Sequence, residues 1–114
     1  MHVYRICQNN PPIEEDMKSQ EALGAKPRRP LTDEDRVHWA EVSTFDTARR
    51  GMEMAQLLPR LGGFIARMEI AEDLINSYDE ETGHVGLHGV APDQLLGAVR
   101  SVWAVHEVPL DDEI

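Results

Sequence analysis

Positively charged residues are scarce in this chain of 114 residues, which has 11 Lys and Arg against 21 Asp and Glu. The resulting formal net charge is −10. Duplex nucleic acid and anionic membrane surfaces carry charge of the same sign, so both are poor partners for this chain. A basic partner, or solubility alone, fits this charge better.

Cysteine and long apolar stretches are also rare. The single cysteine, Cys7, cannot form an internal disulfide, which excludes the disulfide framework of small secreted domains and favours a reducing, cytoplasmic location. The longest strictly apolar run covers residues 102–105, whereas a membrane-spanning helix needs about 20 such residues. No segment near residue 1 has the apolar core of a signal peptide, so we expect a protein that is neither exported by that route nor embedded in a membrane.

The length and the apolar content suit one small globular domain. Apolar residues make up 41% of the chain, which is enough for a modest core. We therefore expect a single domain over residues 1–114 whose acidic end, residues 110–114, is frayed.

Hydrophobic periodicity and breaker residues predict alternating strands and helices. Strand 64–70 alternates strictly, which predicts that Phe64 and every second residue after it face the core while Ile65 faces outward. Asn10, Thr32 and Asp46 are the expected caps of the first three helices. The expected strands are 2–7, 41–45, 64–70, 74–78, 84–88 and 99–108, and the expected helices are 11–23, 32–40, 47–58 and 92–98.

The order of these elements mixes hairpin-length with helix-length connections. That mixture predicts the α+β class, with a small mixed or split β-sheet and three to four short helices. No internal repeat with a period of about 20–50 residues is present, which excludes repeat architectures.

The histidines near residue 86 do not predict a metal site. His84 and His88 are four residues apart, but Gly83, Gly86 and Gly89 disfavour a helix there. In a strand, two residues at this spacing lie about 13 Å apart, which is too far to share an ion. No metal is therefore expected.

Two other reactive or charged features have ordinary structural explanations. Cys7 could act as a nucleophile only beside a histidine, and because no local signature supports such a pair we expect an inert core residue. Lys26, Arg28 and Arg29 form the only compact basic patch, on a proline-rich loop, and are expected to face solvent.

A different combination of residues carries a functional hint. Tyr4 and Arg5 lie in the first expected strand, and Ser43, Thr44 and Phe45 form a later strand that leads into helix 47–58. This arrangement resembles the ADP-ribosyltransferase fold family, whose members bind NAD in a cleft of a split sheet. The resemblance covers residues 2–7 and 41–106.

The resemblance implies roles for the residues that bind NAD. Arg5, with Tyr4 or His2 as alternatives, would hold the phosphate or the ribose of NAD. Thr44 and Phe45, together with the neighbouring serine, would line the nicotinamide pocket. In such a site an Arg5→Ala variant should lose NAD binding and keep nearly all of its thermal stability.

The resemblance also implies the catalytic residues. Gly83 and His84 lie near the expected position of the family's third motif, so His84 would take an acid/base role and Ser43 would be the second catalytic residue. The late glutamate of the family has no clear counterpart, since Glu107 falls at the end of the last expected strand. The implied function is NAD binding with ADP-ribosyl transfer or NAD cleavage, and the acceptor would be water, a phosphate or a macromolecule.

Two alternatives come from the charge and from the last strand. The net charge of −10 and the repeated acidic runs suit a non-enzymatic interaction module that binds a basic protein, as immunity proteins, antitoxins and nucleic-acid mimics do. The strand at 99–108 could join two copies in a homodimer, with Trp103 exposed.

Overall fold

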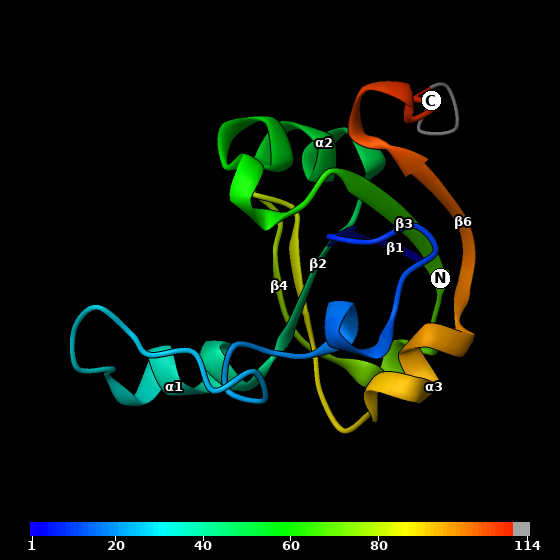
Figure 1. Cartoon of the computed structure of the whole chain (residues 1–114). Helices are drawn as coiled ribbons and strands as arrows, with labels where there is room; N and C mark the ends of the chain where they lie inside the picture. The colour runs from blue at the N-terminus through cyan, green and yellow to red at the C-terminus, as the bar shows by residue number, and fades with distance from the viewer. Residues whose placement is uncertain (111–114) are drawn as a thin grey trace.

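In the computed structural model, which describes residues 1–110, six strands form one sheet in the order β4-β5-β2-β1-β3-β6 (Figure 1). Every pairing is antiparallel. The strands are β1 (His2–Cys7), β2 (Val42–Phe45), β3 (Phe64–Glu69), β4 (Ile75–Asp79), β5 (His84–Leu87) and β6 (Val99–Ala104).

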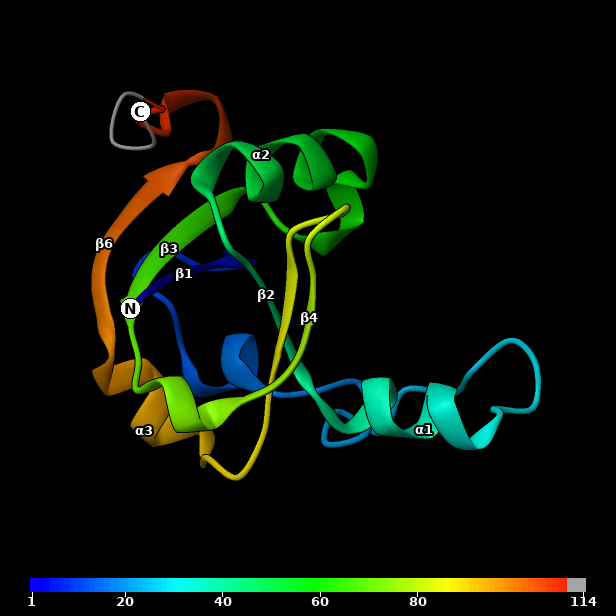
Figure 2. The same ribbon diagram turned by 180° about the vertical axis from the view of Figure 1, so that it is seen from behind.

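Helices cover both faces of the sheet. Helix α2 lies along one side, α3 lies at the opposite end, and α1 projects away from the body in both views (Figures 1 and 2). Within residues 1–110, none of the helices has the length and apolar character needed to cross a membrane. The α-helices are α1 (Asp33–Ala40), α2 (Ala48–Leu57) and α3 (Pro92–Gly97), and the 3-10 helices are η1 (Glu14–Met17), η2 (Pro59–Leu61), η3 (Glu72–Leu74) and η4 (Val105–Glu107).

Strands β1 and β2 are joined at only one residue pair, Tyr4 with Phe45. By contrast, β1 pairs with β3 along its whole length, and β2 pairs with β5 along its whole length. The sheet thus consists of two well-paired halves that meet at a single point and diverge on either side of it. The candidate site described below lies at this divergence.

Each face of the sheet has its own buried cluster. On the α2 side, Tyr4, Phe45 and Ile65 pack against Ala48 and Ala55 of the helix. Small residues on α2 let the helix approach the sheet closely. On the other side, Met17 of η1 and Leu95 of α3 close over a cluster that includes Val3, Cys7, Val42, Ala66, Met68, Val85 and Leu87.

The α+β class, the small sheet and the short helices predicted from the sequence are confirmed. Most predicted elements form within one residue of their expected ends: strands 2–7, 41–45, 64–70, 74–78 and 84–88, and helices 32–40, 47–58 and 92–98. Thr32 caps α1 as expected, because its hydroxyl accepts a hydrogen bond from the backbone N–H of Asp35 at 3.1 Å.

The prediction of a helix at 11–23 is wrong, because only the short η1 forms there and turns follow at residues 20–24. A continuous α-helix would use the carbonyls of Asp16 and Lys18 for its own i to i+4 bonds. Arg5 takes both carbonyls instead, at 2.9 and 3.2 Å. The buried Asp16 carboxylate also accepts the backbone N–H groups of Gln8 and Ile13, which fixes the loop before η1.

Two predictions about α2 and the strand beneath it are also wrong. Ile65 does not face outward; it is fully buried, because α2 covers the face of the sheet that strand alternation had assigned to solvent. The cap of α2 is Thr47, not Asp46. The Asp46 carboxylate instead accepts the Tyr78 hydroxyl at 2.7 Å and the Arg50 guanidinium at 3.3 Å, so it bonds to side chains and not to the free backbone N–H groups of α2.

The C-terminal strand is shorter than expected. β6 ends at Ala104 and the chain turns into η4, so the predicted strand over 99–108 is only partly formed. Trp103 is half-buried rather than exposed, since the Arg67 guanidinium lies 5.5 Å from its ring centre. Of the tail expected to be frayed, Leu110 packs against the cluster under α2, and residues 111–114 lie outside the described residues.

Gly62 joins η2 to the end of β1 through a close backbone contact. Its φ is +144°, and a Cβ there would lie 2.2 Å from the carbonyl oxygen of Cys7. Gly62→Ala should therefore lower the free energy of unfolding by about 2 kcal/mol or more in urea denaturation. The neighbouring Gly63→Ala is the control and should stay within about 0.5 kcal/mol of wild type, because a Cβ at that position meets nothing within 4 Å. Equal effects of the two substitutions would contradict this packing.

Candidate functional site

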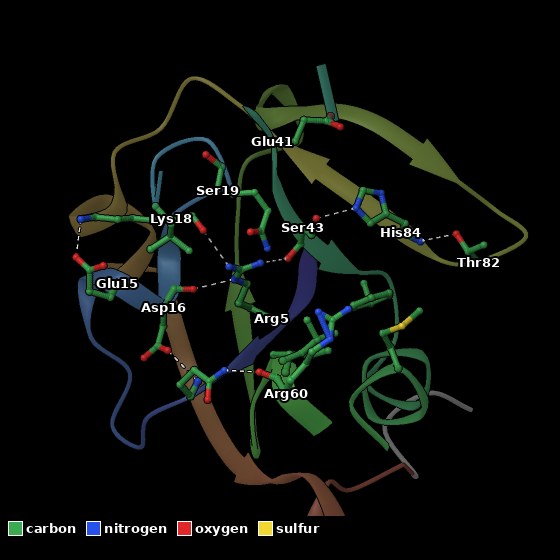
Figure 3. Close-up of a pocket in the computed structure, with 17 residues that line it drawn as sticks. Arg5, Glu15, Asp16, Lys18, Ser19, Glu41, Ser43, Arg60, Thr82 and His84 are labelled. Carbon is green, nitrogen blue, oxygen red and sulfur yellow. Dashed lines mark hydrogen bonds and ion pairs between the residues drawn. The ribbon is translucent and has the colours of Figure 1, made fainter. Parts of the chain in front are cut away.

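A pocket of about 570 Å³ opens where β1 and β2 diverge (Figure 3). Arg5 and Ser43 line it from the two diverging strands, and His84 lines it from β5. The segment after η1 and the short helix η2 complete the walls. A volume of this size is typical of sites for small molecules.

Arg5 holds the two halves of the sheet at the pocket. Its guanidinium donates hydrogen bonds to three backbone carbonyls, those of Asp16 at 2.9 Å, Lys18 at 3.2 Å and Ser43 at 2.6 Å. One side chain on β1 therefore fixes both η1 and β2. The bonds to Asp16 and Lys18 set the wall formed by residues 15–20, and the bond to Ser43 sets the separation of β1 and β2.

The charge of Arg5 survives this burial. Burial lowers the pKa of Arg5, and the nearby Asp16 carboxylate opposes that shift. The ordinary pKa of a guanidinium is so high that the group stays protonated at neutral pH. Its five N–H groups exceed the three bonds it makes to carbonyls, so two make no hydrogen bond within residues 1–110.

Ser43 and His84 face one another across β2 and β5. The Ser43 hydroxyl lies 3.0 Å from Nε2 of His84, and both side chains are half-buried on the pocket wall (Figure 3). Phe45 packs edge-on against the imidazole, with ring centres 6.2 Å apart. Burial lowers the pKa of His84, an effect that the Glu41 carboxylate opposes. The imidazole is therefore neutral at pH 7 and able to accept a proton.

Glu41 is a buried carboxylate behind this pair, and only 3% of the residue is exposed. Three side chains hold it: Ser77 at 2.7 Å, Asn76 at 3.0 Å and His38 at 2.6 Å. Gly86 makes room for it, since a Cβ there would lie 2.2 Å from a carboxylate oxygen. Burial acts to raise the pKa of Glu41, but these hydrogen bonds outweigh it and the pKa is lowered.

Glu41 could not be recognised as a site residue from the sequence. It stands directly before β2 in a chain rich in acidic residues, and its partners Asn76 and Ser77 are more than 30 residues away. Burial and the close approach of Gly86 distinguish it from the solvated acids, and both depend on the pairing of β2 with β5. Arg60 of η2 also lines the pocket and was likewise not anticipated.

Four of the six residues suggested by the resemblance line the pocket, namely Arg5, Ser43, Phe45 and His84. Tyr4 does not, because it points into the cluster under α2 and is 6% exposed. Thr44 is fully buried on the opposite side of β2, where its hydroxyl donates to the carbonyl of Val85 at 2.9 Å.

Neither His2, the alternative to Arg5 for holding NAD, nor Cys7, the candidate nucleophile, lines the pocket. His2 is exposed and pairs with Glu69 at 2.7 Å. Cys7 is 1% exposed in the core, and burial raises the pKa of its thiol to about 12, so it is neutral and unreactive. His88 is exposed, and no group of three or more potential metal ligands occurs within residues 1–110.

The chain matches no protein-family model, no curated protein and no solved structure. The function proposed below therefore depends on the pocket itself.

Removal of the Arg5 side chain should unfold the site, contrary to the sequence-based expectation of unchanged stability. Arg5→Ala would leave three carbonyls without their donor, so we expect a loss of about 3 kcal/mol or more in the free energy of unfolding. Arg5→Lys should also be destabilised, because one ammonium group cannot serve three separate segments in the same way. The exposed Arg28→Ala is the control. Wild-type stability in Arg5→Ala would show that these bonds do not hold the strands.

The ionised Glu41 should stabilise the fold above its pKa. Because its pKa in the folded state lies below the ordinary value of 4.5, its contribution is complete above that pH and is lost as the pH falls through the folded value. Glu41→Gln should lower the free energy of unfolding by about 1–3 kcal/mol at pH 7. The NH2 group of glutamine would face a donor where the carboxylate of Glu41 accepts a hydrogen bond. The deficit should shrink as the pH falls below 4.5 in urea titrations.

The control for this prediction is Glu34→Gln, at an exposed position of α1, because the Glu34 side chain makes no hydrogen bond or ion pair within residues 1–110. It should follow the wild-type curve at every pH. A Glu41→Gln deficit that does not change with pH would contradict an ionised Glu41.

Proposed function

We propose that the pocket binds NAD and that the protein cleaves the nicotinamide–ribose bond, passing ADP-ribose to water or to another acceptor. The observation that carries this proposal is the convergence of Arg5, Ser43, Phe45 and His84 on one pocket between β1 and β2. These residues come from separate parts of the resemblance to ADP-ribosyltransferases, and nothing in their spacing along the chain requires them to meet.

The pocket has the mixture of groups that a dinucleotide requires. Phe45, which is 7% exposed, adds a small apolar aromatic contact to the wall, and Ser43 beside it supplies a hydrogen-bonding hydroxyl. The guanidinium groups of Arg5 and Arg60 add positive charge to the wall of the pocket. Because Phe45, Ser43, Arg5 and Arg60 line the same pocket, they suit a ligand with an aromatic end and an anionic middle.

Neutral His84 would act as the general base of the reaction. When the carbon–nitrogen bond of NAD breaks, its electron pair goes to the ring nitrogen and nicotinamide leaves neutral. A water or acceptor hydroxyl then forms the new carbon–oxygen bond, and its proton passes to Nε2 of His84 directly or through the Ser43 hydroxyl. The burial that lowers the pKa of His84 keeps this nitrogen free to accept the proton at pH 7.

A second hollow also borders His84. It is lined by His38, Ser77, Tyr78, Asp79, Thr82 and His84, and it shares Thr82 and His84 with the larger pocket. Water or a side chain of a macromolecule would reach the imidazole from this hollow while NAD occupies the larger pocket.

Substitution of His84 should separate binding from cleavage. His84→Gln keeps a hydrogen-bonding group near Ser43 but removes the base, so we expect NAD binding within about threefold of wild type and a loss of about 100-fold or more in nicotinamide release. A proton NMR time course reports both quantities, through broadened NAD signals and through free nicotinamide. The exposed His88→Gln is the matched control and should behave as wild type.

The pH dependence gives a second test of the base. The wild-type rate should rise as the pH increases through the lowered pKa of His84 and should be level from about pH 7, because only the neutral imidazole accepts a proton. Full cleavage by His84→Gln would exclude His84 as the base. Unchanged NAD spectra at high protein concentration would overturn the proposal as a whole.

A second candidate function has support from α1. This helix has no buried residue and projects from the body, and it begins with three acids, Asp33, Glu34 and Asp35 (Figure 1). An exposed acidic helix suits a basic protein partner, and such binding should weaken steeply between low and moderate salt in a pulldown. A salt-insensitive partner would count against it.

A further inference from the structure

Arg60 is the one pocket cation that makes no side-chain hydrogen bond or ion pair within the described residues 1–110. Lys18 pairs with Glu15 at 2.5 Å, and Arg5 is bonded to carbonyls. The Arg60 side chain instead extends from η2 toward the middle of the pocket (Figure 3). Its whole guanidinium is available to a ligand.

The backbone that carries Arg60 is held firmly. Pro59 begins η2, and the carbonyl of Arg60 accepts a hydrogen bond from the Gln8 amide at 2.7 Å. Gly62 then lies directly on the carbonyl of Cys7, which leaves no room for a side chain. Two contacts to the end of β1 thus fix the position of η2 relative to Arg5. A rigid support of this kind lowers the entropy lost when a ligand is bound.

The acids around the pocket are already engaged. Glu15 is paired with Lys18, and Glu41 accepts three hydrogen bonds. The Asp16 carboxylate accepts the backbone N–H groups of Gln8 and Ile13 and the Asn9 amide. Among the charged side chains that line the pocket within residues 1–110, the Arg60 guanidinium is therefore the one left without a partner, in a chain whose net charge is −10.

We infer that Arg60, together with the two unused N–H groups of Arg5, binds the phosphate groups of a nucleotide in this pocket. This inference deepens the proposed function, because it names the part of the ligand that is recognised and the residue that recognises it. Two guanidinium groups present planar, paired donors, which match the several oxygens of a phosphate or pyrophosphate. Arg5 braces the sheet, and Arg60 supplies most of the donors for the anion.

The test compares three ligands by isothermal titration calorimetry: NAD, ADP and adenosine. For wild-type protein, ADP and NAD should bind at least about 10-fold more tightly than adenosine, which lacks phosphate. Arg60→Ala should weaken NAD and ADP binding by about 10- to 100-fold, as expected for the loss of charge-assisted hydrogen bonds. Arg60→Lys should recover part of that loss, because it restores the charge without the paired donors.

The matched control is Arg36→Ala, which removes an exposed arginine of α1 outside the pocket. It should bind all three ligands as wild type does. Because the Arg60 side chain is exposed, Arg60→Ala should keep the wild-type melting temperature, so a loss of binding reports on recognition.

The outcomes separate this inference from the proposed function. NAD cleavage that persists unchanged in Arg60→Ala, with unchanged affinity, overturns the phosphate site and leaves NAD cleavage standing. ADP binding that depends on Arg60 in a protein that does not cleave NAD supports the phosphate site and overturns the proposed function. Adenosine binding equal to ADP binding overturns the phosphate site, and failure of all three ligands to bind overturns both.

Discussion

The structure depends on one buried positive charge, the guanidinium of Arg5. Strands β1 and β2 share a single residue pair, so backbone pairing alone does not fix how the two halves of the sheet meet. Arg5 supplies the missing connection through the carbonyls of Asp16, Lys18 and Ser43. Because the same bonds stop residues 16–18 from continuing as a helix, Arg5 determines both the opening of the sheet and the shape of the wall beside it.

Because Arg5 is bonded to three carbonyls, the residues that hold the pocket together differ from those that can contact a ligand. A residue that braces three segments has few donors left for a ligand, so Arg60 on η2 is better suited to recognition. A similar division holds around His84. Glu41 is too well bonded and too deeply buried to react, but its charge lies behind the imidazole and acts on the His84 pKa. Ser43 and His84 remain as the polar pair that faces the cavity.

Local patterns in the sequence predicted most of the secondary structure, because alternation in β3 and the small-residue stripe of α2 are strong local signals. The failures have long-range causes. The helix expected at 11–23 does not form because Arg5 on β1 binds the carbonyls that the helix would need. Ile65 is buried by α2, and the alternation within one strand cannot predict that a helix covers its second face. For the site, the resemblance to the ADP-ribosyltransferase fold family suggested Arg5, Ser43, Phe45 and His84, which line the pocket, and also Tyr4 and Thr44, which do not. Glu41 and Arg60 could not be predicted as site residues. Glu41 is placed by the pairing of β2 with β5, and Arg60 is placed by the contact of Gly62 with Cys7.

The proposed nucleotide site lies where β1 and β2 diverge. An NMR titration of ¹⁵N-labelled protein with NAD tests it most directly, since the backbone amides and the arginine Nε–Hε groups report where the ligand lies. NAD bound in this pocket should shift the signals of Ser43, Phe45 and His84 and the Nε–Hε signal of Arg60, with the signals of α1 unchanged. An absence of shifts, or shifts confined to α1, would contradict it.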